Sequence, residues 1–536
     1  MPFGDDEQPL PARPAGVTGL PARQVQLIKY HNRSAPLAPN DQEVMLELRG
    51  IASAADREPL DLVAVIDTSG SMADGAKLDK AKSALSFVIR KLTDRDRLCI
   101  VRFAHQAARL CPLRCATEAA QADLEALVGG LEAGGGTNIQ AGLETGLGVV
   151  SARRATSGRA ASVMLMSDGD ENNGDARAVE PGGVPVHTFG FGSDHDPMLL
   201  GAVATKSLGG VFNYVADGDS PTNLTETFSQ ILGGLLTIIA QDLELTVTPL
   251  PGEATIDKPM DAGSYPVIPA AAAAGSSPVT VRFGTLYSAE ERKVVVELAL
   301  SDRTAARPYR AHVAQVQYRF TFQGQQVTSD PDRITIRRGR GSAAAGEAPP
   351  PQVGAEVARR RHAGSIRAAM EEAESDRLEG ARGILAEALR ALERVAGDPV
   401  PVVEMLRKEL RRLLELFKTK DAYRGQGRPY AVASLGSHGR QRFAARGEAG
   451  DVRLFATRRM DTYLEQAKRP DEKPPSADED VIEEPAGAGA GRRGEVDGVS
   501  VALRVLTAVL GLLSFSIMAS ARTSGWDGGD RYETYR

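Results

Sequence analysis

Between residues 60 and 240, short runs of apolar residues alternate with segments whose apolar residues recur at helical spacing. Leu60 to Ile66 (LDLVAVI) and Ala161 to Met166 (ASVMLM) are almost continuously apolar, whereas Lys77 to Leu92 carries its apolar residues mostly three or four positions apart. A strand is apolar throughout only when both of its faces are buried, which is typical of a parallel sheet covered by helices on both sides. The alternation therefore predicts a doubly wound α/β domain with a mostly parallel sheet over residues 59–241.

A different pattern flanks this domain. After residue 241 the sequence alternates apolar and polar residues with a period near two, between turns rich in Pro and Gly, as antiparallel strands do. Two segments ahead of the α/β domain, Gln24 to Tyr30 and Glu43 to Leu48, have the same pattern. We therefore predict one β-sandwich, contributed by residues 23–58 and 242–337, into which the α/β domain is inserted. A separate β-domain with an N-terminal arm is the alternative.

Beyond the sandwich the sequence becomes helical. Residues 338–356 are predicted to form a linker rich in Gly, Ala and Pro, and residues 357–465 a helical region. Within this region, Val357 to Val395 and Val402 to Phe417 have amphipathic spacing and predict a helical hairpin with coiled-coil character. The basic, Gly-rich stretch Arg424 to Arg446 favours a solvated loop over a nucleic-acid contact.

The two ends of the chain have weaker patterns. Residues 1–22 are predicted to be a disordered tail, residues 466–498 a disordered acidic and Gly-rich linker, and residues 522–536 a second tail. Val505 to Ala521 has no charged residue and is near the lower length limit for a membrane-spanning helix. Residues 499–521 are therefore either a transmembrane helix, with its N-terminal side in the cytoplasm, or a buried C-terminal helix.

Composition excludes several classes of protein. Hydrophobic residues make up 42% and charged residues 25% of the 536 residues, which excludes collagen-like, wholly disordered and polytopic membrane proteins. The net charge of −6 gives no indication of a nucleic-acid binder. Cys99, Cys111 and Cys115 are too few for a disulfide scaffold or a four-ligand zinc site. The acidic N-terminus lacks the apolar run of a secretory signal, so the predicted location is the cytoplasm.

Polar side chains with metal-binding chemistry follow two of the apolar strands. The segment DTSGS at residues 67–71 comes directly after the first strand and precedes a helix. Hard divalent cations prefer oxygen ligands, and carboxylate and hydroxyl oxygens can converge on the tight turn that Gly70 allows. A Gly-rich loop (GGGTN) and the turn after ASVMLM (SDGD) are expected at the same sheet edge, where the carboxyl ends of parallel strands meet. The predicted ligands of a divalent cation are Asp67, Ser69, Ser71, Thr137 and Asp168.

Other candidate residues near this site are predicted to have structural roles. Asp170, Glu171 and Asp175 follow the SDGD turn closely, and a solvated acidic loop is favoured over a second cation site. His187 lies within a predicted strand and is expected to be packed rather than chemically active.

Residues 60 to 240 resemble a von Willebrand factor type A domain with a complete metal-ion-dependent adhesion site. The resemblance rests on the D-x-S-x-S motif, the GGGTN loop and the SDGD turn, and the family pattern maps onto the five residues above. In that family the cation is usually Mg²⁺, and a carboxylate from a partner protein fills one open coordination position. The resemblance implies a Mg²⁺ cofactor, with Mn²⁺ or Ca²⁺ as alternatives, and ligand binding rather than catalysis.

Longer segments extend the resemblance to about residues 24 to 465. PLDLVAVIDTSGSM, KLTDRDRLCIVRFAHQAARLCPLR, VHTFGFGSDHD and SHGRQRFAARG look like the plant type A proteins related to the wavy-growth ubiquitin ligases. Ligase members of that group carry a RING module ahead of the type A domain. The chain has no Cys before Cys99, so neither that module nor ligase activity of its own is expected.

A second resemblance covers the C-terminus. The segment VALRVLTAVLGLLSFSIMASARTSGW looks like the first span of a Casparian-strip membrane-protein-like family, whose members have four spans. Because the chain ends after one, a fusion of two neighbouring genes is favoured over a genuine tail anchor.

These features predict a non-enzymatic, divalent-cation-dependent protein-binding protein, with an adhesion or scaffold role in the cytoplasm. The expected partner is a protein that offers an acidic side chain to the metal, and no nucleic-acid partner is expected. Two alternatives stay open. One is a substrate-recruiting component of a ubiquitin-ligase assembly without its own RING, and the other is an adhesion protein tethered to the plasma membrane through residues 499–521.

Overall fold

The computed structural model describes residues 6–9, 24–51, 57–216, 222–258, 260–269, 275, 277–340, 349–394, 401–447, 452–469, 472 and 474–475. All of them belong to one compact unit, Met1–Glu484. The predicted transmembrane segment 499–521 and the tail 522–536 lie outside these residues, as do most of the predicted tail 1–22 and linker 466–498. None of the described helices has both the length and the apolar composition that crossing a bilayer requires.

A parallel sheet lies at the centre of the α/β domain. Its parallel strands are, in spatial order, β10 (Phe212–Val215), β9 (Val186–Phe191), β8 (Ala160–Ser167), β4 (Leu60–Asp67) and β5 (Arg97–Phe103). Two short strands pair antiparallel with β5, namely β6 (Ala107–Arg109) and β7 (Arg114–Cys115). The prediction of a doubly wound, mostly parallel sheet is confirmed.

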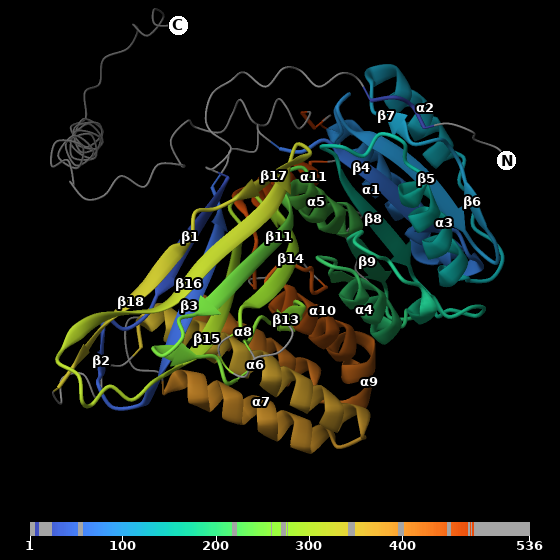
Figure 1. The fold of residues 1–536 in the computed structure, drawn as a ribbon. Coiled ribbons are helices and arrows are strands. Elements are labelled where there is room, and N and C mark those ends of the chain that lie inside the picture. Colours follow the sequence, from blue (N-terminus) through green and yellow to red (C-terminus); the bar gives the residue numbers. More distant parts are fainter. Residues whose placement is uncertain are drawn as a thin grey trace, which may run out of the picture. The chain divides into compact units, whose positions relative to one another are not determined.

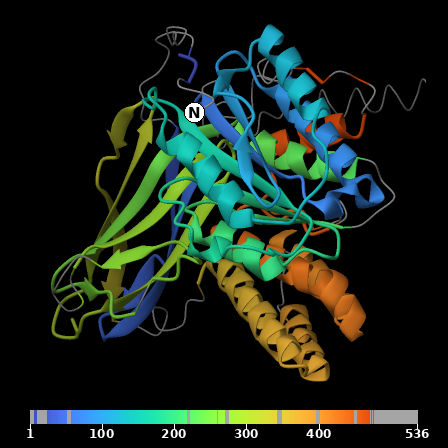
Figure 2. The ribbon, with the colours of Figure 1, turned by 90° about the vertical axis from the view of Figure 1, so that its right-hand side faces the viewer.

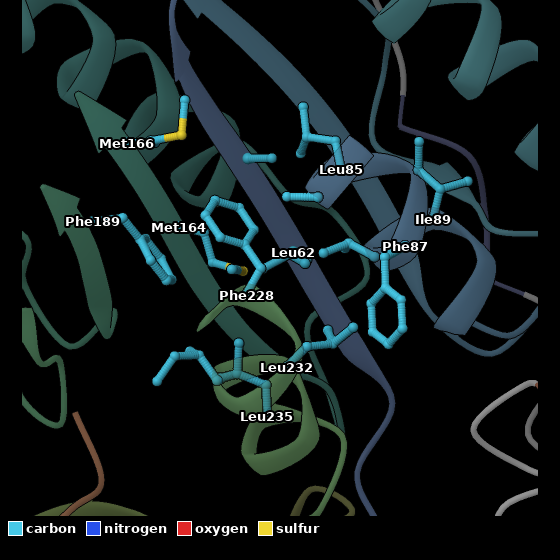
Figure 3. Close-up of a cluster of buried hydrophobic side chains, with 14 of the residues drawn as sticks. Leu62, Leu85, Phe87, Ile89, Met164, Met166, Phe189, Phe228, Leu232 and Leu235 are labelled. Carbon is cyan, nitrogen blue, oxygen red and sulfur yellow. The ribbon is translucent and has the colours of Figure 1, made fainter. Parts of the chain in front are cut away.

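Helices cover both faces of this sheet, because its strands are apolar on both. One face carries α1 (Lys77–Lys91), α2 (Glu118–Gly129) and α5 (Asn223–Leu235), and the other carries α3 (Ile139–Ser151) and α4 (Pro197–Lys206). Figure 3 shows the first face, where Leu62 and Met164 of the strands lie against Phe228 of α5. The adjacent strand residues Val63 and Val163 belong to the opposite cluster. Successive side chains point to opposite faces of a strand, which explains the continuous apolar runs in the sequence.

Two mostly antiparallel sheets make up the flanking β unit (Figure 1). The first has the order β1 (Val25–Tyr30), β3 (Asn40–Gly50), β15 (Glu291–Leu300) and β12 (Ala254–Thr255). The second has the order β13 (Val267–Pro269), β14 (Val279–Tyr287), β11 (Ile238–Pro249), β16 (Tyr309–Phe322), β18 (Asp332–Gly339) and β2 (Ser34–Pro36), with β17 (Gln325–Thr328) paired to β16. One buried apolar cluster joins the two sheets.

The strands ahead of the α/β domain pair with strands that follow it. β3 pairs antiparallel with β15, and β2 pairs parallel with β18. The prediction that the α/β domain is inserted into one sandwich is therefore confirmed, and the alternative of a separate β-domain with an N-terminal arm is wrong.

The sequence pattern does not indicate where α5 ends and β11 begins. Helical spacing of apolar residues continues from Thr225 to Ile239, but α5 ends at Leu235 and Ile238 already begins β11. Apolar residues at the end of the helix and at the start of the strand merge into one pattern. At Gly234 a Cβ would lie 2.6 Å from side-chain atoms of Met460 and Tyr287, so the glycine allows a close approach of these elements.

The C-terminal part of the unit contains more helices than the predicted hairpin. They are α6 (Pro351–Glu374), α7 (Leu378–Glu393), α8 (Pro401–Leu416), the short α9 (Lys420–Ala422), α10 (Arg428–Arg440) and α11 (Arg458–Ala467). α6 and α7 lie side by side (Figure 2). The helix expected over 357–395 instead begins at Pro351, within the predicted linker, and breaks after Glu374. Asp376 adopts a left-handed φ of 64°, a conformation that Asp tolerates better than most residues, so the chain turns there.

The basic stretch Arg424 to Arg446 is not the solvated loop that the sequence favours. α10 lies within it, and Arg440, Arg442 and Arg446 are all buried. Arg442 donates to the carboxylate of Glu290 over 2.8 and 2.9 Å, and Glu290 also accepts from Arg292 over 2.7 Å. We call this set the arginine junction; its members are Arg292, Arg440, Arg442, Arg446, Glu290 and Glu409.

The arginine junction connects all three parts of the unit. Arg440 donates to the carbonyl of Ser207 after α4, and Arg446 forms an ion pair with Glu409 of α8 at 3.1 Å. The chain after α10 also covers the edge of the parallel sheet, because the N–H of Tyr214 donates to the carbonyl of Ala445 over 3.0 Å. Burial of these arginines is therefore explained by partners far away in the sequence.

Candidate metal centre

The predicted ligands lie at the point where the strand order of the parallel sheet reverses. From β4 the chain continues to β5 on one side, whereas from β8 it continues to β9 and β10 on the other. Asp67 is the last residue of β4, and Asp168 directly follows the last residue of β8. In open α/β sheets, ligands bind outside the carboxyl ends of the strands at such a switch point.

Short contacts connect four of the five predicted residues. Ser69 Oγ lies 3.1 Å from Ser71 Oγ, and Ser71 Oγ donates to Asp168 Oδ1 over 2.8 Å. Asp67 Oδ1 accepts from the backbone N–H of Ser69 over 2.8 Å, which holds the turn against the end of β4. The side chains of Asp67, Ser69 and Asp168 are buried.

The fifth predicted residue, Thr137, lies beside this group. A Cβ placed on Gly169 would be 3.5 Å from Ser71 Oγ and 3.8 Å from Thr137 Oγ1, so both hydroxyls flank one point. The loop that carries Thr137 contacts the motif directly, because the N–H of Gly70 donates to the carbonyl of Gly135 over 3.0 Å. Gly135 has a φ of 88°, and this left-handed conformation explains a glycine in that loop.

The donor set fits a hard divalent cation. Ligands of an octahedral Mg²⁺ ion, at about 2.0–2.1 Å from the metal, lie about 2.9 Å from their neighbours. The observed oxygen separations of 2.8 and 3.1 Å are close to this value. Carboxylate and hydroxyl oxygens are the ligand type that Mg²⁺, Mn²⁺ and Ca²⁺ accept.

The electrostatics of the site also fit a cation. Burial raises the pKa of Asp67 to about 6, and the nearby carboxylate of Asp168 acts in the same direction. Within the described part of the chain, Lys77 is the one cation that contacts either carboxylate, with Nζ 2.8 Å from Asp168 Oδ2. Two buried carboxylates beside one ammonium leave negative charge that a divalent ion can neutralise.

Three residues that support the predicted ligands were not identified from the sequence. Lys77 begins α1 and contacts Asp168, Ser167 donates to Asp67 Oδ2 over 2.6 Å, and Asn172 accepts from the N–H of Thr137 over 3.0 Å. Ser167 directly precedes Asp168, and this adjacency is the signal that could have indicated it. Lys77 and Asn172 give no such signal, because a lysine at a helix start and an asparagine in a loop are ordinary surface residues.

The acidic loop after Asp168 is held by backbone contacts and borders a cavity. Glu171 accepts from the N–H groups of Gln140 and Ala176, at 2.7 and 2.8 Å. A cavity of about 980 Å³ lies beside the loop. Its walls include Asp170, Asp194 and Asp196 from the α/β domain and Glu374, Lys420, Arg424 and Arg428 from the C-terminal helices.

Carboxylates crowd one wall of this cavity. Burial raises the pKa of Asp170, and the carboxylates of Asp196 and Asp194 add to the increase. Among the described residues, these acids form no group of three whose side chains could share an ion. The alternative of a second cation site, which the sequence favoured less than a solvated acidic loop, therefore finds no support among the described residues.

A second group of side chains of the kinds that bind metals surrounds Glu409 of the arginine junction. His362 of α6 and His438 of α10 each place Nε2 next to the same oxygen of Glu409, at 2.7 and 2.8 Å. Arg359 lies 3.3 Å from Nδ1 of His438, and because arginine can only donate, Nδ1 accepts and Nε2 carries the proton. A metal-bound His needs the opposite arrangement, with its second ring nitrogen donating to an acceptor. The group therefore fits a hydrogen-bonded clasp and does not fit a metal.

Ionisation of this clasp is set by burial and neighbouring charges. Burial lowers the pKa of His438 to about 4, against the opposing effect of Glu409. Burial alone would raise the pKa of Glu409, but the charges of His438 and Arg446 outweigh it and hold this pKa well below its usual value. His187, predicted to be packed, is buried inside β9, and burial lowers its pKa to about 3.

Comparison with known families assigns the domain that carries the metal centre. Residues 61–230 match the von Willebrand factor type A domain, and residues 400–469 match the family described as VWA / Hh protein intein-like. Domains of the first family generally bind proteins and often hold a divalent cation at this motif. The second match covers α8, α10 and α11, the helices that close the arginine junction.

Two relatives illustrate how far the similarity extends. The chain is 31% identical over 280 residues to the E3 ubiquitin-protein ligase WAV3 of Arabidopsis thaliana, which covers 49% of this chain and 34% of that protein. It is 28% identical over 323 residues to the uncharacterized protein sll0103 of Synechocystis sp., covering 58% of this chain and 74% of that protein. The chain thus spans about a third of the length of the plant relative.

A solved structure has the same fold. The von Willebrand factor type A protein from Catenulispora acidiphila aligns over 77% of this chain and 97% of its own, with a TM-score of 0.58 and 19% identity. This alignment covers more of the chain than the type A domain alone. Residues 61–230 thus match a von Willebrand factor type A domain, and the chain is similar to the plant ligase WAV3 and to bacterial proteins such as sll0103.

Proposed function

We propose that this protein binds a partner protein through a divalent cation and that it acts as an adhesion or scaffold protein rather than as an enzyme. The observation that carries the proposal is the group of oxygen atoms at the switch point, spaced 2.8 and 3.1 Å apart beside two buried carboxylates. Mg²⁺ is the proposed cation, with Mn²⁺ or Ca²⁺ as alternatives. Its ligands would be Asp67, Ser69, Ser71, Thr137 and Asp168.

The proposed partner offers an acidic side chain to the metal. Hydroxyl ligands carry no charge, so a cation held largely by serine and threonine keeps its affinity for a further carboxylate. The neighbouring cavity supports a protein ligand, because it could receive residues that flank the acidic one. Lys420, Arg424 and Arg428 on its far wall are suited to additional acidic residues of the same partner.

A metal titration tests the site directly. Isothermal titration calorimetry should detect Mg²⁺ binding to the wild-type protein, and Ser71→Ala should weaken it by about tenfold or more because one oxygen ligand is lost. Ser83→Ala is the matched control, since Ser83 is an exposed serine of α1 whose hydroxyl bonds to Asp79. Equal Mg²⁺ affinity in the wild type and Ser71→Ala would overturn the proposed site.

Partner binding should depend on the same ion. A partner identified by affinity capture should dissociate in chelator and rebind when Mg²⁺ is restored, and it should bind poorly to Ser71→Ala. Changing the partner's acidic residue to its amide should weaken binding by about tenfold, and chelator should add little to that loss. Binding that is equally strong in chelator would place recognition elsewhere on the surface.

A second candidate function follows from the similarity to WAV3. The chain would recruit substrates to a ubiquitin-ligase assembly in which another protein supplies the transfer chemistry. A reconstituted ubiquitination assay separates the two classes. Ubiquitin conjugates formed by the purified chain with activating and conjugating enzymes alone would contradict the proposal that it is not an enzyme.

The cytoplasm is the proposed place of action. Three cysteines in 536 residues are too few for a disulfide scaffold, which suits a reducing compartment. Attachment to the plasma membrane through residues 499–521 is the alternative, and fractionation of cells that express the natural protein decides between them.

A further inference from the structure

A cavity separate from the metal centre lies between α5 of the type A domain and the C-terminal helices. Its volume is about 550 Å³, within the range typical of small-molecule sites. Its lining comes from α5, from α8, from Tyr430 of α10 and from the segment 443–447. None of the five proposed metal ligands contributes to it.

The floor of the cavity is buried and largely apolar. Tyr430, Phe443, Ala444 and Ala445 line it, and each of these side chains is at most 7% exposed. Phe443 lies under the guanidinium of Arg453, whose Cζ is 5.3 Å from the ring centroid. An aromatic or apolar group could therefore pack against this floor.

The floor also carries a polar group without a partner. The Tyr430 hydroxyl makes no hydrogen bond with any described residue, although the side chain is only 6% exposed. The hydroxyl oxygen itself is not fully buried, so it can donate to a ligand in the cavity. Arg446 lines the same cavity and is also buried, and its Nη2 has no partner among the described residues.

The rim of the cavity is basic. Lys408, Arg411 and Arg412 project from α8 as exposed residues. Arg446 and Arg453 also line the cavity, but they form ion pairs with Glu409 and Asp461. The carboxylates in the lining are Glu226 and Glu415, and Glu226 accepts from the hydroxyl of Thr222 over 2.8 Å. Arg412 has no ion pair or hydrogen bond within the described part of the chain. Excess positive charge around a concave site attracts anions.

We propose that this cavity binds a small organic anion with an aromatic or apolar body, its body on Phe443 and Tyr430 and its carboxylate or phosphate at Arg412. Arginine matches both kinds of anionic group, because its guanidinium can donate two parallel hydrogen bonds. The Tyr430 hydroxyl supplies a further donor. Since α5, α8 and α10 all contribute to the lining, a bound anion would connect the type A domain to the C-terminal helices.

The test uses the full chain and four defined probes. Phenyl phosphate and phenylpropanoate are the anionic probes, phenylpropanol is the neutral probe of matched shape, and inorganic phosphate lacks the apolar body. Calorimetry and thermal unfolding should show that at least one anionic probe binds and stabilises the protein. The neutral probe and inorganic phosphate should each bind about tenfold more weakly. The tighter of the two anionic probes identifies which anionic group the site prefers.

Matched variants test whether the anionic probe binds in this cavity. Arg412→Ala should weaken binding of the anionic probe by about tenfold, and Tyr430→Phe should weaken it by about threefold or more. Arg390→Ala is the control, because Arg390 is an exposed arginine of α7 that does not line the cavity. Thermal unfolding without probe should be unchanged in Arg412→Ala and Arg390→Ala, since both side chains are exposed.

Four results would overturn the inference. They are no binding of either anionic probe, equal binding of phenylpropanol, equal effects of Arg412→Ala and Arg390→Ala, or binding of an oligonucleotide without binding of the small anions. Loss of Mg²⁺ binding in Ser71→Ala should leave the anionic probes bound as before, so this inference and the proposed metal site can fail separately.

Discussion

The metal centre and the arginine junction both bury charged side chains, but their charges are balanced differently. At the metal centre, Asp67 and Asp168 are contacted by one cation of the described chain, Lys77. In the junction, Glu290 accepts from both Arg292 and Arg442. Carboxylates in excess attract an external cation. The junction instead has four arginines for two carboxylates, and its arginines also donate to backbone carbonyls such as those of Ser207 and Gly209, so its buried charges find their partners within the protein and contribute to the fold. Whether buried charges find all their partners within the protein thus distinguishes a ligand site from a structural contact.

Removing the shared carboxylate of the junction should have the largest effect. Glu290→Gln leaves the buried guanidinium groups of Arg292 and Arg442 without their counter-charge, so the free energy of unfolding should fall by about 3–5 kcal/mol. Chemical denaturation measures this loss. Glu291→Gln is the control, because Glu291 is a half-exposed neighbour, and its change should stay under about 1 kcal/mol. Similar losses in the two variants would mean that the buried ion pairs of the junction do not stabilise the fold.

Acid should weaken the protein through two buried histidines. The pKa values of His438 and His187 are lowered to about 4 and about 3, whereas an unfolded histidine titrates near 6.5. Below pH 6.5 the unfolded chain therefore binds protons that the folded chain does not, and stability falls as the pH decreases. Each histidine should account for a loss of about 3 kcal/mol by pH 4.

The variant His187→Leu measures how much of this loss of stability in acid is due to His187. Both ring nitrogens of His187 are buried without a hydrogen-bond partner in the described structure, so His187→Leu should fold and should flatten the decrease between pH 6.5 and pH 4. Denaturant titrations at several pH values measure the slope. An unchanged slope would show that His187 does not titrate as the structure implies.

Removing charge at the metal centre should weaken Mg²⁺ binding without unfolding the protein. Asp67→Asn keeps the shape of the side chain and removes one of two buried carboxylates, so Mg²⁺ affinity should fall by about tenfold or more, as calorimetry would show. The free energy of unfolding without Mg²⁺ should change by about 1 kcal/mol at most, because burial already disfavours this charge. Asp79→Asn is the control, because the side chain of Asp79 is exposed. A collapse of stability in Asp67→Asn would make this region structural, like the junction.

The smallest expected effect concerns Lys77. Its ammonium lies 2.8 Å from Asp168 Oδ2 and competes with a metal ion for that carboxylate, so Lys77→Met should raise Mg²⁺ affinity by about threefold to tenfold. Lys77→Arg keeps the positive charge and should not raise the affinity. A lower affinity in Lys77→Met would instead show that Lys77 positions Asp168 for the metal.

The sequence alone was sufficient for much of the type A domain. The apolar run Leu60 to Ile66 ends at Asp67, and continuous apolar runs arise only where both faces of a strand are buried. This local rule placed the strands, most of the helices and the loops that carry Ser69, Thr137 and Asp168 at one edge of the sheet. Strand pairing across the inserted domain also followed from local alternation in β3 and β15.

The tertiary structure alone decided which charged residues are buried. Arg440, Arg442 and Arg446 look like a surface loop in the sequence, but the partner of Arg442 is Glu290, 152 residues away. In the same way, Lys77 contacts Asp168 at a separation of 91 residues. A charged side chain is stable in the interior only when a counter-charge or enough hydrogen-bond partners surround it, and chain folding brings those partners together from distant positions. Local patterns record whether a side chain is apolar, but they do not record which partner a charged side chain will meet.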